Sequence, residues 1–248
     1  MSESKIYAVP AGYAEANTLS ESDYQRLYAE SVNNPEAFWA NEAKCVEWSK
    51  PFTKVKDVSF DRDNFHVRWY EDGEINLSYN CLDRHLATHP DKTAIIWEGD
   101  HPSEQKQVSY RELHREVCRF ANALKSKGIR KGDRVIIYMP MVPEAAIAMM
   151  ACARIGAIHS VVFAGFSSSS LTDRIIDCGA KAILTSDGNF RGNKKIGIKS
   201  VVDEALEKSA VDTVIVYQRT GQETSMVSGR DFWWHEVLEG QSEVCPAE

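Results

Sequence analysis

The 248-residue sequence lacks both standard glycine-rich nucleotide fingerprints, Gly-x-Gly-x-x-Gly and Gly-x-x-x-x-Gly-Lys-Ser/Thr. Neither a dinucleotide-binding βαβ unit nor a P-loop is therefore predicted. An excess of positive charge is also absent, because 29 Lys and Arg residues stand against 36 Asp and Glu residues, a net charge of −7. A general nucleic-acid or anionic-membrane surface needs a net positive field, so we expect no nucleic-acid partner and no membrane partner.

None of the six cysteines is spaced as Cys-x-x-Cys, which argues against a zinc site or a dithiol pair. The N-terminus lacks the charged-then-apolar pattern of a secretory signal. The most apolar stretch, residues 135–166, contains two prolines, Glu144 and Arg154, and a membrane helix would have to bury those charges. We therefore expect reduced thiols, a cytoplasmic protein, and a buried strand–helix–strand unit in place of a membrane span.

The composition, with 43% hydrophobic and 10% aromatic residues, can build a sizeable core. Residues 1–19 are expected to form a flexible arm, followed by a short helical segment rich in aromatic residues. There Ser20 or Ser22 can cap a first helix, and Pro35 is placed to begin a second. Residues 65–70 alternate between apolar and polar side chains, which indicates a strand.

Further along, strands and helices alternate regularly. Strands are expected at 94–97, 134–139, 159–163, 181–185 and 213–217, and helices at 109–128, 143–155, 170–178, 199–209 and 231–238. Short strands alternating with helices predict an α/β fold with right-handed crossovers and a mostly parallel sheet. The strands read as continuous apolar runs, so we expect both faces of the sheet to be buried.

Ligands of open parallel sheets collect beyond the carboxyl ends of the strands, which here points to loops 140–143, 164–169 and 186–195. The third loop places Arg191, Lys194 and Lys195 within five residues of an otherwise acidic chain. A planar guanidinium fork beside a lysine point charge suits a phosphate monoester. The alternative is a solvated basic turn that precedes a helix.

The second loop places small residues between Phe163 and Phe166, and they could form a slot for a planar ring. The alternative is that both phenylalanines are core residues, while the serines that follow cap the next helix. Asp83, His85 and His89 lie near one another, but no further ligand is spaced to complete a metal site with them. Ser160 lacks the Gly-x-Ser-x-Gly turn of a hydrolase, and we expect core positions for Met139, Met141, Met149 and Met150.

Several segments together resemble the AMP-forming acetyl-CoA synthetases, the acetate–CoA ligases of the acyl-adenylate-forming superfamily. They are Asn-Leu-Ser-Tyr-Asn-Cys-Leu-Asp-Arg-His (76–85), Ala-Ile-Ile-Trp-Glu-Gly-Asp (94–100), Ser-Tyr-Arg-Glu-Leu (109–113), Lys-Gly-Asp-Arg-Val (131–135), residues 139–167, and Arg-Gly-Asn-Lys (191–194). Lys-Gly-Asp-Arg-Val occurs across the superfamily. The Asn-Cys-Leu-Asp-Arg-His and Trp-Glu-Gly-Asp segments favour the acetyl- and propionyl-type synthetases.

The resemblance implies a two-step reaction in which acetate attacks Mg-ATP to give acetyl-AMP and diphosphate, and CoA then displaces AMP. It implies that residues 20–80 are the N-terminal segment typical of acetyl-CoA synthetases. Residues 81–248 would be a partial AMP-dependent synthetase/ligase domain, the first subdomain of an adenylate-forming N-terminal domain. By motif, Arg191, Gly192, Asn193 and Lys194 fall where the family holds the 3′-phosphate of CoA, and Phe163, Ala164 and Gly165 fall beside its adenine. Family members usually have glycine where Asn193 and Ala164 stand.

The resemblance also implies what lies outside these residues. The family's phosphate loop, acyl pocket, ATP-ribose carboxylate, magnesium ligands and C-terminal catalytic lysine would all follow residue 248. We therefore assign no catalytic residue and no metal ligand, and expect the chain alone to be inactive without the missing C-terminal portion. Three alternatives stay open: a portion of a propionyl-CoA synthetase, a non-catalytic module that binds CoA or 3′-phosphonucleotides, and a gene fragment that folds poorly.

Overall fold

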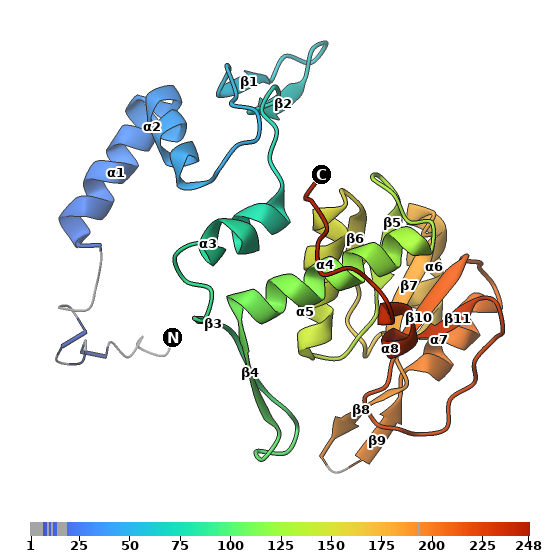
Figure 1. Cartoon of the computed structure of the whole chain (residues 1–248). Helices are drawn as coiled ribbons and strands as arrows, with labels where there is room; N and C mark the ends of the chain where they lie inside the picture. Colours follow the sequence, from blue (N-terminus) through green and yellow to red (C-terminus); the bar gives the residue numbers. More distant parts are fainter. Residues whose placement is uncertain (1–6, 9, 11, 14–18, 193) are drawn as a thin grey trace, which may run out of the picture. The chain divides into compact units, whose positions relative to one another are not determined.

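The chain forms two compact units, residues 1–75 and 76–248, in a computed structural model (Figure 1). The structure describes residues 7, 8, 10, 12, 13, 19–192 and 194–248. The expected N-terminal arm lies largely outside the described residues, and so does Asn193 of the candidate phosphate clamp.

The first unit begins with helix α1 (Glu21–Asn33), followed by α2 (Pro35–Glu42) and the short 3₁₀ helix η1 (Ala43–Cys45). Of the two expected caps, Ser20 is the one used, since its hydroxyl accepts from the Asp23 amide at 3.1 Å in a capping box. Strand β2 (His66–Trp69) confirms the alternating segment. It pairs antiparallel with β1 (Lys56–Ser59), which was not predicted.

Aromatic rings hold the first unit together. The Tyr70 ring packs against Phe52 and Trp48, with centroids 4.7 and 5.4 Å away, and its hydroxyl donates to the Trp39 carbonyl at 2.9 Å. Tyr70 has a φ of 50°, a left-handed backbone that is rare for a bulky residue. Among the described residues before Asn76, Ala43 is the only buried one, so these ring contacts take the place of a conventional core.

The second unit contains a five-stranded parallel sheet with the order β11-β10-β7-β5-β6. Its strands are β5 (Arg134–Ile137), β6 (Ile158–Val161), β7 (Ala182–Ser186), β10 (Thr213–Tyr217) and β11 (Asp231–Trp233). Every pair in this sheet is parallel, as the alternating pattern predicted. All carboxyl ends therefore meet at one edge of the sheet.

Helices cover both faces of the sheet. One layer contains α4 (Tyr110–Ser126), α5 (Pro143–Arg154) and α8 (Trp234–Leu238), and the other contains α6 (Ser168–Cys178) and α7 (Lys199–Leu206). Adjacent residues of β5 point to opposite layers: Ile137 joins the core with α4 and α5, and Ile136 joins the core with α6 and α7. Ser109 caps α4 in a second capping box, as its position predicted.

Three expected elements differ from the prediction. The strand at 94–97 is β3 (Thr93–Glu98), which pairs antiparallel with β4 (Gln105–Ser109) instead of joining the parallel sheet. The loop at 186–195 contains a hairpin of β8 (Gly188–Arg191) and β9 (Lys194–Gly197). The helix at 231–238 starts as strand β11, because the free edge of β10 offers backbone partners to its aromatic residues.

Strand β6 also departs from the expectation that both faces of the sheet are buried. It lies at the edge of the sheet, and the side chains of Ile158 and Val161 are 56% and 55% exposed. The continuous apolar run was therefore read correctly as a strand, but it did not reveal the strand's place at the edge. Met141 is likewise 89% exposed, so its predicted core position is wrong, whereas Met139 is buried.

The Asn-Cys-Leu-Asp-Arg-His segment forms η2 (Tyr79–Asp83) and α3 (Arg84–Leu86) and docks on the helical layer. Arg154, only 3% exposed, donates from two nitrogens to the Asp83 carboxylate at 2.7 and 2.8 Å. His114 Nε2 lies 3.2 Å from the same carboxylate. Asn76 donates to the Ala153 carbonyl at 3.0 Å. The segment that carried much of the resemblance is therefore held on the helical layer by these hydrogen bonds.

This network shifts two titrations in opposite directions. Burial alone would raise the pKa of Asp83, but hydrogen bonds from Arg154 and His114 outweigh it and hold that pKa well below its usual range. The Asp83 carboxylate, followed by the Cys118 thiol, raises the pKa of His114 to about 9 despite burial. At neutral pH the cluster therefore holds two cations around one carboxylate.

Replacing Arg154 by methionine should strongly destabilise the second unit, because it leaves the half-buried Asp83 carboxylate without its main partner. We expect the free energy of unfolding, measured by urea denaturation, to fall by about 3 kcal/mol. The control is Arg111→Met, which breaks an exposed pair with Asp91 and should cost less than about 1 kcal/mol. The double variant Asp83→Leu/Arg154→Met should recover much of the loss. Equal losses in the single variants would contradict the buried-pair interpretation.

Stability should fall as pH rises through the titration of His114. Its folded pKa of about 9 exceeds the ordinary 6.5, so its contribution is complete below pH 6.5 and disappears as pH passes 9. We expect the wild-type chain to lose about 1–2 kcal/mol more than His114→Gln over this range, the partly exposed ring reducing the full effect. Parallel pH profiles for the two proteins, measured by thermal unfolding, would disprove this assignment.

Candidate functional site

The carboxyl edge of the parallel sheet gathers the loops that follow β5, β6, β7 and β10. The hairpin β8–β9 follows β7, near the centre of the sheet, and the segment 162–167 follows the edge strand β6. Strand β5 lies between β6 and β7, so the two candidate loops start two strand spacings apart, about 10 Å. The predicted site residues are thus placed at one edge by the topology.

Arg191 and Lys194 are directly opposite each other at the tip of the β8–β9 hairpin. Opposed residues of an antiparallel pair have Cβ atoms about 4.5–5.5 Å apart. Gly192 between them has a φ of 52°, the left-handed geometry that a tight hairpin turn requires. Both side chains are exposed, and neither makes an ion pair with any residue that the structure describes.

Two like charges directly opposite each other destabilise a sheet pair. An anion bound between Arg191 and Lys194 would turn this repulsion into attraction, and the guanidinium fork can hold two oxygens at once. The Lys195 ammonium donates to the Thr220 carbonyl at 2.7 Å. Of the three cations that the sequence grouped, the structure therefore places two opposite each other, and the third is hydrogen-bonded to the loop after β10.

A buried aspartate anchors the base of the hairpin. Asp187, 1% exposed, accepts hydrogen bonds from the amides of Gly188, Arg219 and Gly221, each at 2.7 Å. It also accepts from the amide and the hydroxyl of Thr220, at 3.0 and 3.1 Å. A buried carboxylate is tolerated when its oxygens are saturated with donors in this way. The start of the hairpin and the loop after β10 are therefore tied together.

The segment after β6 presents aromatic rings to solvent. Phe163 and Phe166 are 71% and 43% exposed and meet edge to face, with centroids 6.0 Å apart. The alternative that both are core residues is therefore wrong. A side chain at position 165 would approach the Phe163 ring to 2.6 Å, so Gly165 is needed for this ring position. Ala164 is half-buried and packs against the core with α6 and α7, and Ser167 caps α6 as expected.

Sequence reasoning missed the loop after β10. Arg219 is the second residue after this strand, and its guanidinium lies over the rings of Phe190 on β8 and Trp97 on β3. The rule that ligands collect beyond strand ends applies to residues 218–222 as it does to the other loops. A signal was therefore present, although nothing in the sequence indicated the partners of Arg219.

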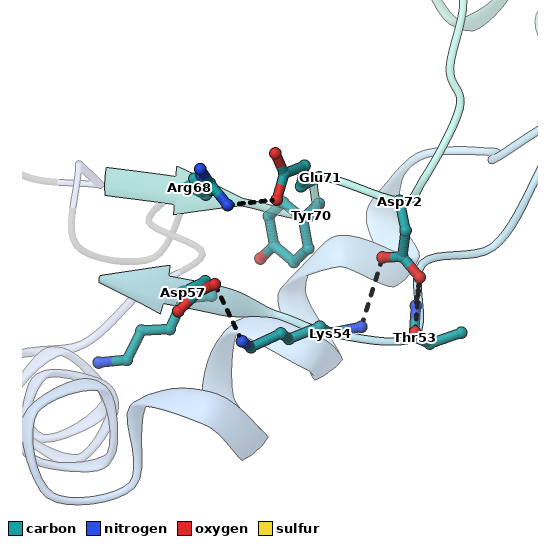
Figure 2. A pocket seen from close by; sticks show the side chains of 8 residues that line it. Thr53, Lys54, Asp57, Arg68, Tyr70, Glu71 and Asp72 are labelled. Carbon is teal, nitrogen blue, oxygen red and sulfur yellow. Dashed lines mark hydrogen bonds and ion pairs between the residues drawn. The ribbon is translucent and has the colours of Figure 1, made fainter. Parts of the chain in front are cut away.

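A separate hollow of about 360 Å³ lies in the first unit (Figure 2). Its charges are largely paired within the wall: Lys54 with Asp57 at 3.1 Å, and Arg68 with Glu71 at 3.5 Å. Asp72 accepts from the Thr53 amide at 2.9 Å. A wall whose charges already neutralise one another offers a phosphate less than the Arg191–Lys194 pair does.

Across the described ranges, no group of three or more His, Cys, Asp or Glu side chains is arranged to hold a metal ion. Within the same part of the chain, none of the helices combines the length and apolar character that crossing a membrane requires.

The chain matches two family profiles in succession. Residues 24–81 match the acetyl-coenzyme A synthetase N-terminus, and residues 82–246 match the AMP-binding enzyme family. Similar curated proteins are the acetyl-coenzyme A synthetases of Shewanella amazonensis, 53% identical over 251 residues, and of Aeromonas salmonicida, 51% identical over 250 residues. Each alignment covers 100% of this chain but 39% of the relative. The chain therefore belongs to the AMP-binding enzyme family, in which it corresponds to the N-terminal portion of acetyl-coenzyme A synthetases.

Proposed function

We propose that this chain supplies part of the coenzyme A site of an acetate–CoA ligase. The ligase would convert acetate, ATP and CoA into acetyl-CoA, AMP and diphosphate through acetyl-AMP. The observation that supports this most directly is the Arg191–Lys194 pair, two opposed cations without an acidic partner among the described residues. A terminal phosphate monoester is the ligand chemistry that such a pair favours.

In this proposal the two candidate loops hold two ends of the same nucleotide. Arg191 and Lys194 bind the 3′-phosphate, and we propose Gly192 and Asn193 as the further residues of this site. The exposed ring of Phe163, with the open backbone of Gly165, lies beside the adenine. The methyl of Ala164 packs partly against the core, which supports the view that alanine is tolerated where family members have glycine.

The chemistry of acid activation would need groups beyond those assigned here. A carboxylate is a poor electrophile, and adenylation gives it a leaving group, which magnesium-bound ATP would supply in the family reaction. We assign no ATP, magnesium or acyl-binding residue and no catalytic residue within 1–248. The contribution of this chain is to bind and orient CoA. We further propose the division 1–19, 20–80 and 81–248, and a cytoplasmic location that suits its six free cysteines.

The closest alternative is a portion of a propionyl-CoA synthetase, since no acyl-pocket residue is assigned. A second alternative is a binding module for CoA or other 3′-phosphonucleotides without catalysis. This alternative rests on the same pair of cations, Arg191 and Lys194. It differs from the leading proposal only in lacking the catalytic groups that the rest of the relatives' length, about 61% (100% less the 39% covered), would add.

Coenzyme A should bind this chain more tightly than 3′-dephospho-CoA, by about 10- to 100-fold, because the missing phosphate removes charge-assisted hydrogen bonds. Isothermal titration calorimetry measures both affinities. Arg191→Gln and Lys194→Gln should each reduce the difference, and the double variant should abolish it. Lys208→Gln removes the same charge from an exposed site elsewhere and should leave the difference intact. Equal affinity of the wild-type chain for both ligands would remove the clamp role.

Purified 1–248 should show no acetate-dependent exchange between ATP and diphosphate, since we place no adenylation residues in it. The positive control is the full-length acetyl-coenzyme A synthetase of Shewanella amazonensis, assayed with the same radiolabelled diphosphate. Exchange above the no-acetate background, abolished by heat denaturation of the chain, would show that adenylation residues are present after all.

A further inference from the structure

The side chain of Arg219 joins two hairpins that are far apart in the sequence. Its guanidinium lies 5.3 Å from the Trp97 ring centroid and 4.8 Å from that of Phe190, within cation–π range of both. The same guanidinium donates from two nitrogens to the two oxygens of Glu104, to Oε1 at 3.2 Å. We call these four residues, Trp97, Glu104, Phe190 and Arg219, the Arg219 bridge.

The Arg219 bridge connects the β8–β9 hairpin, here called the clamp hairpin because it carries Arg191 and Lys194, to the β3–β4 hairpin. Phe190 is the residue before Arg191 on β8, and Trp97 lies on β3. Figure 1 shows both hairpins projecting from the same end of the second unit. A second contact joins their tips, because the Gly192 amide donates to Asp100 Oδ1 at 3.3 Å.

The bridge assigns a structural role to the Trp-Glu-Gly-Asp segment, for which the family resemblance implied no role. Trp97 contacts the Arg219 guanidinium and also donates from Nε1 to the Met141 carbonyl at 2.8 Å. A side chain at Gly99 would collide with the Glu104 carboxylate, so glycine is needed where that carboxylate lies. Asp100 reaches the turn of the clamp. Three of the four residues therefore support the β8–β9 hairpin or its bridge.

The hairpin needs such support. A two-stranded hairpin is only marginally stable by itself, and Arg191 opposite Lys194 adds repulsion in the absence of ligand. Asp187 holds the base of the hairpin but not its tip. Without contacts that hold the hairpin tip, Arg191 and Lys194 would become ordered only when the ligand binds. The entropy cost of this ordering would lower the affinity for the ligand.

We propose that Arg219 is a positioning residue for the phosphate clamp, held by Glu104 and bracing the β8–β9 hairpin through Phe190 and Trp97. This inference rests on the proposed CoA-binding function. Arg219 is paired with Glu104 and its side chain is only 11% exposed, so it acts on the ligand through the hairpin and not as a third phosphate-binding cation.

Glu104→Gln separates the two possible roles of Arg219, because they predict opposite signs. Removing this acid makes the surroundings of the clamp more positive, so a direct electrostatic role of Arg219 predicts tighter CoA binding. A positioning role predicts weaker binding, by about 5- to 10-fold, because the bidentate pair that orients Arg219 is weakened. Arg219→Lys keeps the charge but loses the planar fork, and should weaken CoA binding by a similar factor. Calorimetry with CoA and with 3′-dephospho-CoA measures these effects.

Hydrogen exchange of the ligand-free chain gives an independent readout. In Glu104→Gln and Arg219→Lys, backbone amides of β8 and β9 should exchange at least several-fold faster, while those of the parallel sheet should not change. Glu71→Gln, which breaks an exposed pair with Arg68 in the first unit, is the matched control and should change neither the hairpin nor CoA affinity. Unchanged hairpin exchange, or tighter CoA binding by Glu104→Gln, would overturn the positioning role.

The two readouts separate failure of this inference from failure of the proposed function. If the wild-type chain does not distinguish CoA from 3′-dephospho-CoA, the clamp function fails, whereas faster hairpin exchange in the variants would still show the brace. If the wild-type chain distinguishes the two ligands and the variants retain both affinity and exchange protection, the clamp function stands and the bracing role of Arg219 fails.

Discussion

The candidate site depends on one buried carboxylate, that of Asp187 at the carboxyl end of β7. Five donor groups, namely the amides of residues 188 and 219–221 and the Thr220 hydroxyl, compensate for its burial. Leaving such a group unsatisfied is costly, so the segments that supply the donors are held in one arrangement. The clamp hairpin and the loop that carries Arg219 both begin next to Asp187 and are hydrogen-bonded to it. Asp187 therefore fixes the position of both segments at the base of the hairpin, and the Arg219 bridge holds the hairpin nearer its tip.

Sequence patterns predicted the parts of this chain whose structure is decided locally. The buried strands are continuous apolar runs, and Ser20, Ser109 and Ser167 cap helices through contacts within three residues. The parallel sheet and the place of Arg191 and Lys194 at its carboxyl edge followed from these patterns. Strand β4, with the sequence Gln-Lys-Gln-Val-Ser, has no apolar alternation, and its pairing with β3 decides its structure. The same holds for β8 and β9, which form around the turn at Gly192.

The contacts that complete the site join residues distant in the sequence, and local patterns do not reveal them. Arg219 and Glu104 are separated by 115 positions, and Arg154 and Asp83 by 71. The segments that resemble acetyl-CoA synthetases accordingly have two different structural roles. Asn76 and Asp83 dock η2 and α3 on the helical layer, whereas Trp97 and Asp100 reach toward the clamp hairpin. Similarity to a family marked both kinds of segment, and only the contacts distinguish them.

The exposed edge strand β6 has a consequence for how the chain behaves in concentrated solution. An unpaired sheet edge is a template for adding a strand from another molecule, and many proteins protect such edges with lysine, proline or a bulge. Strand β6, with the sequence Ile-His-Ser-Val, contains neither lysine nor proline. Burial lowers the pKa of His159, so the strand is uncharged at neutral pH. Within the described residues no strand pairs with the outer side of β6, so this edge is a surface on which chains could associate edge to edge.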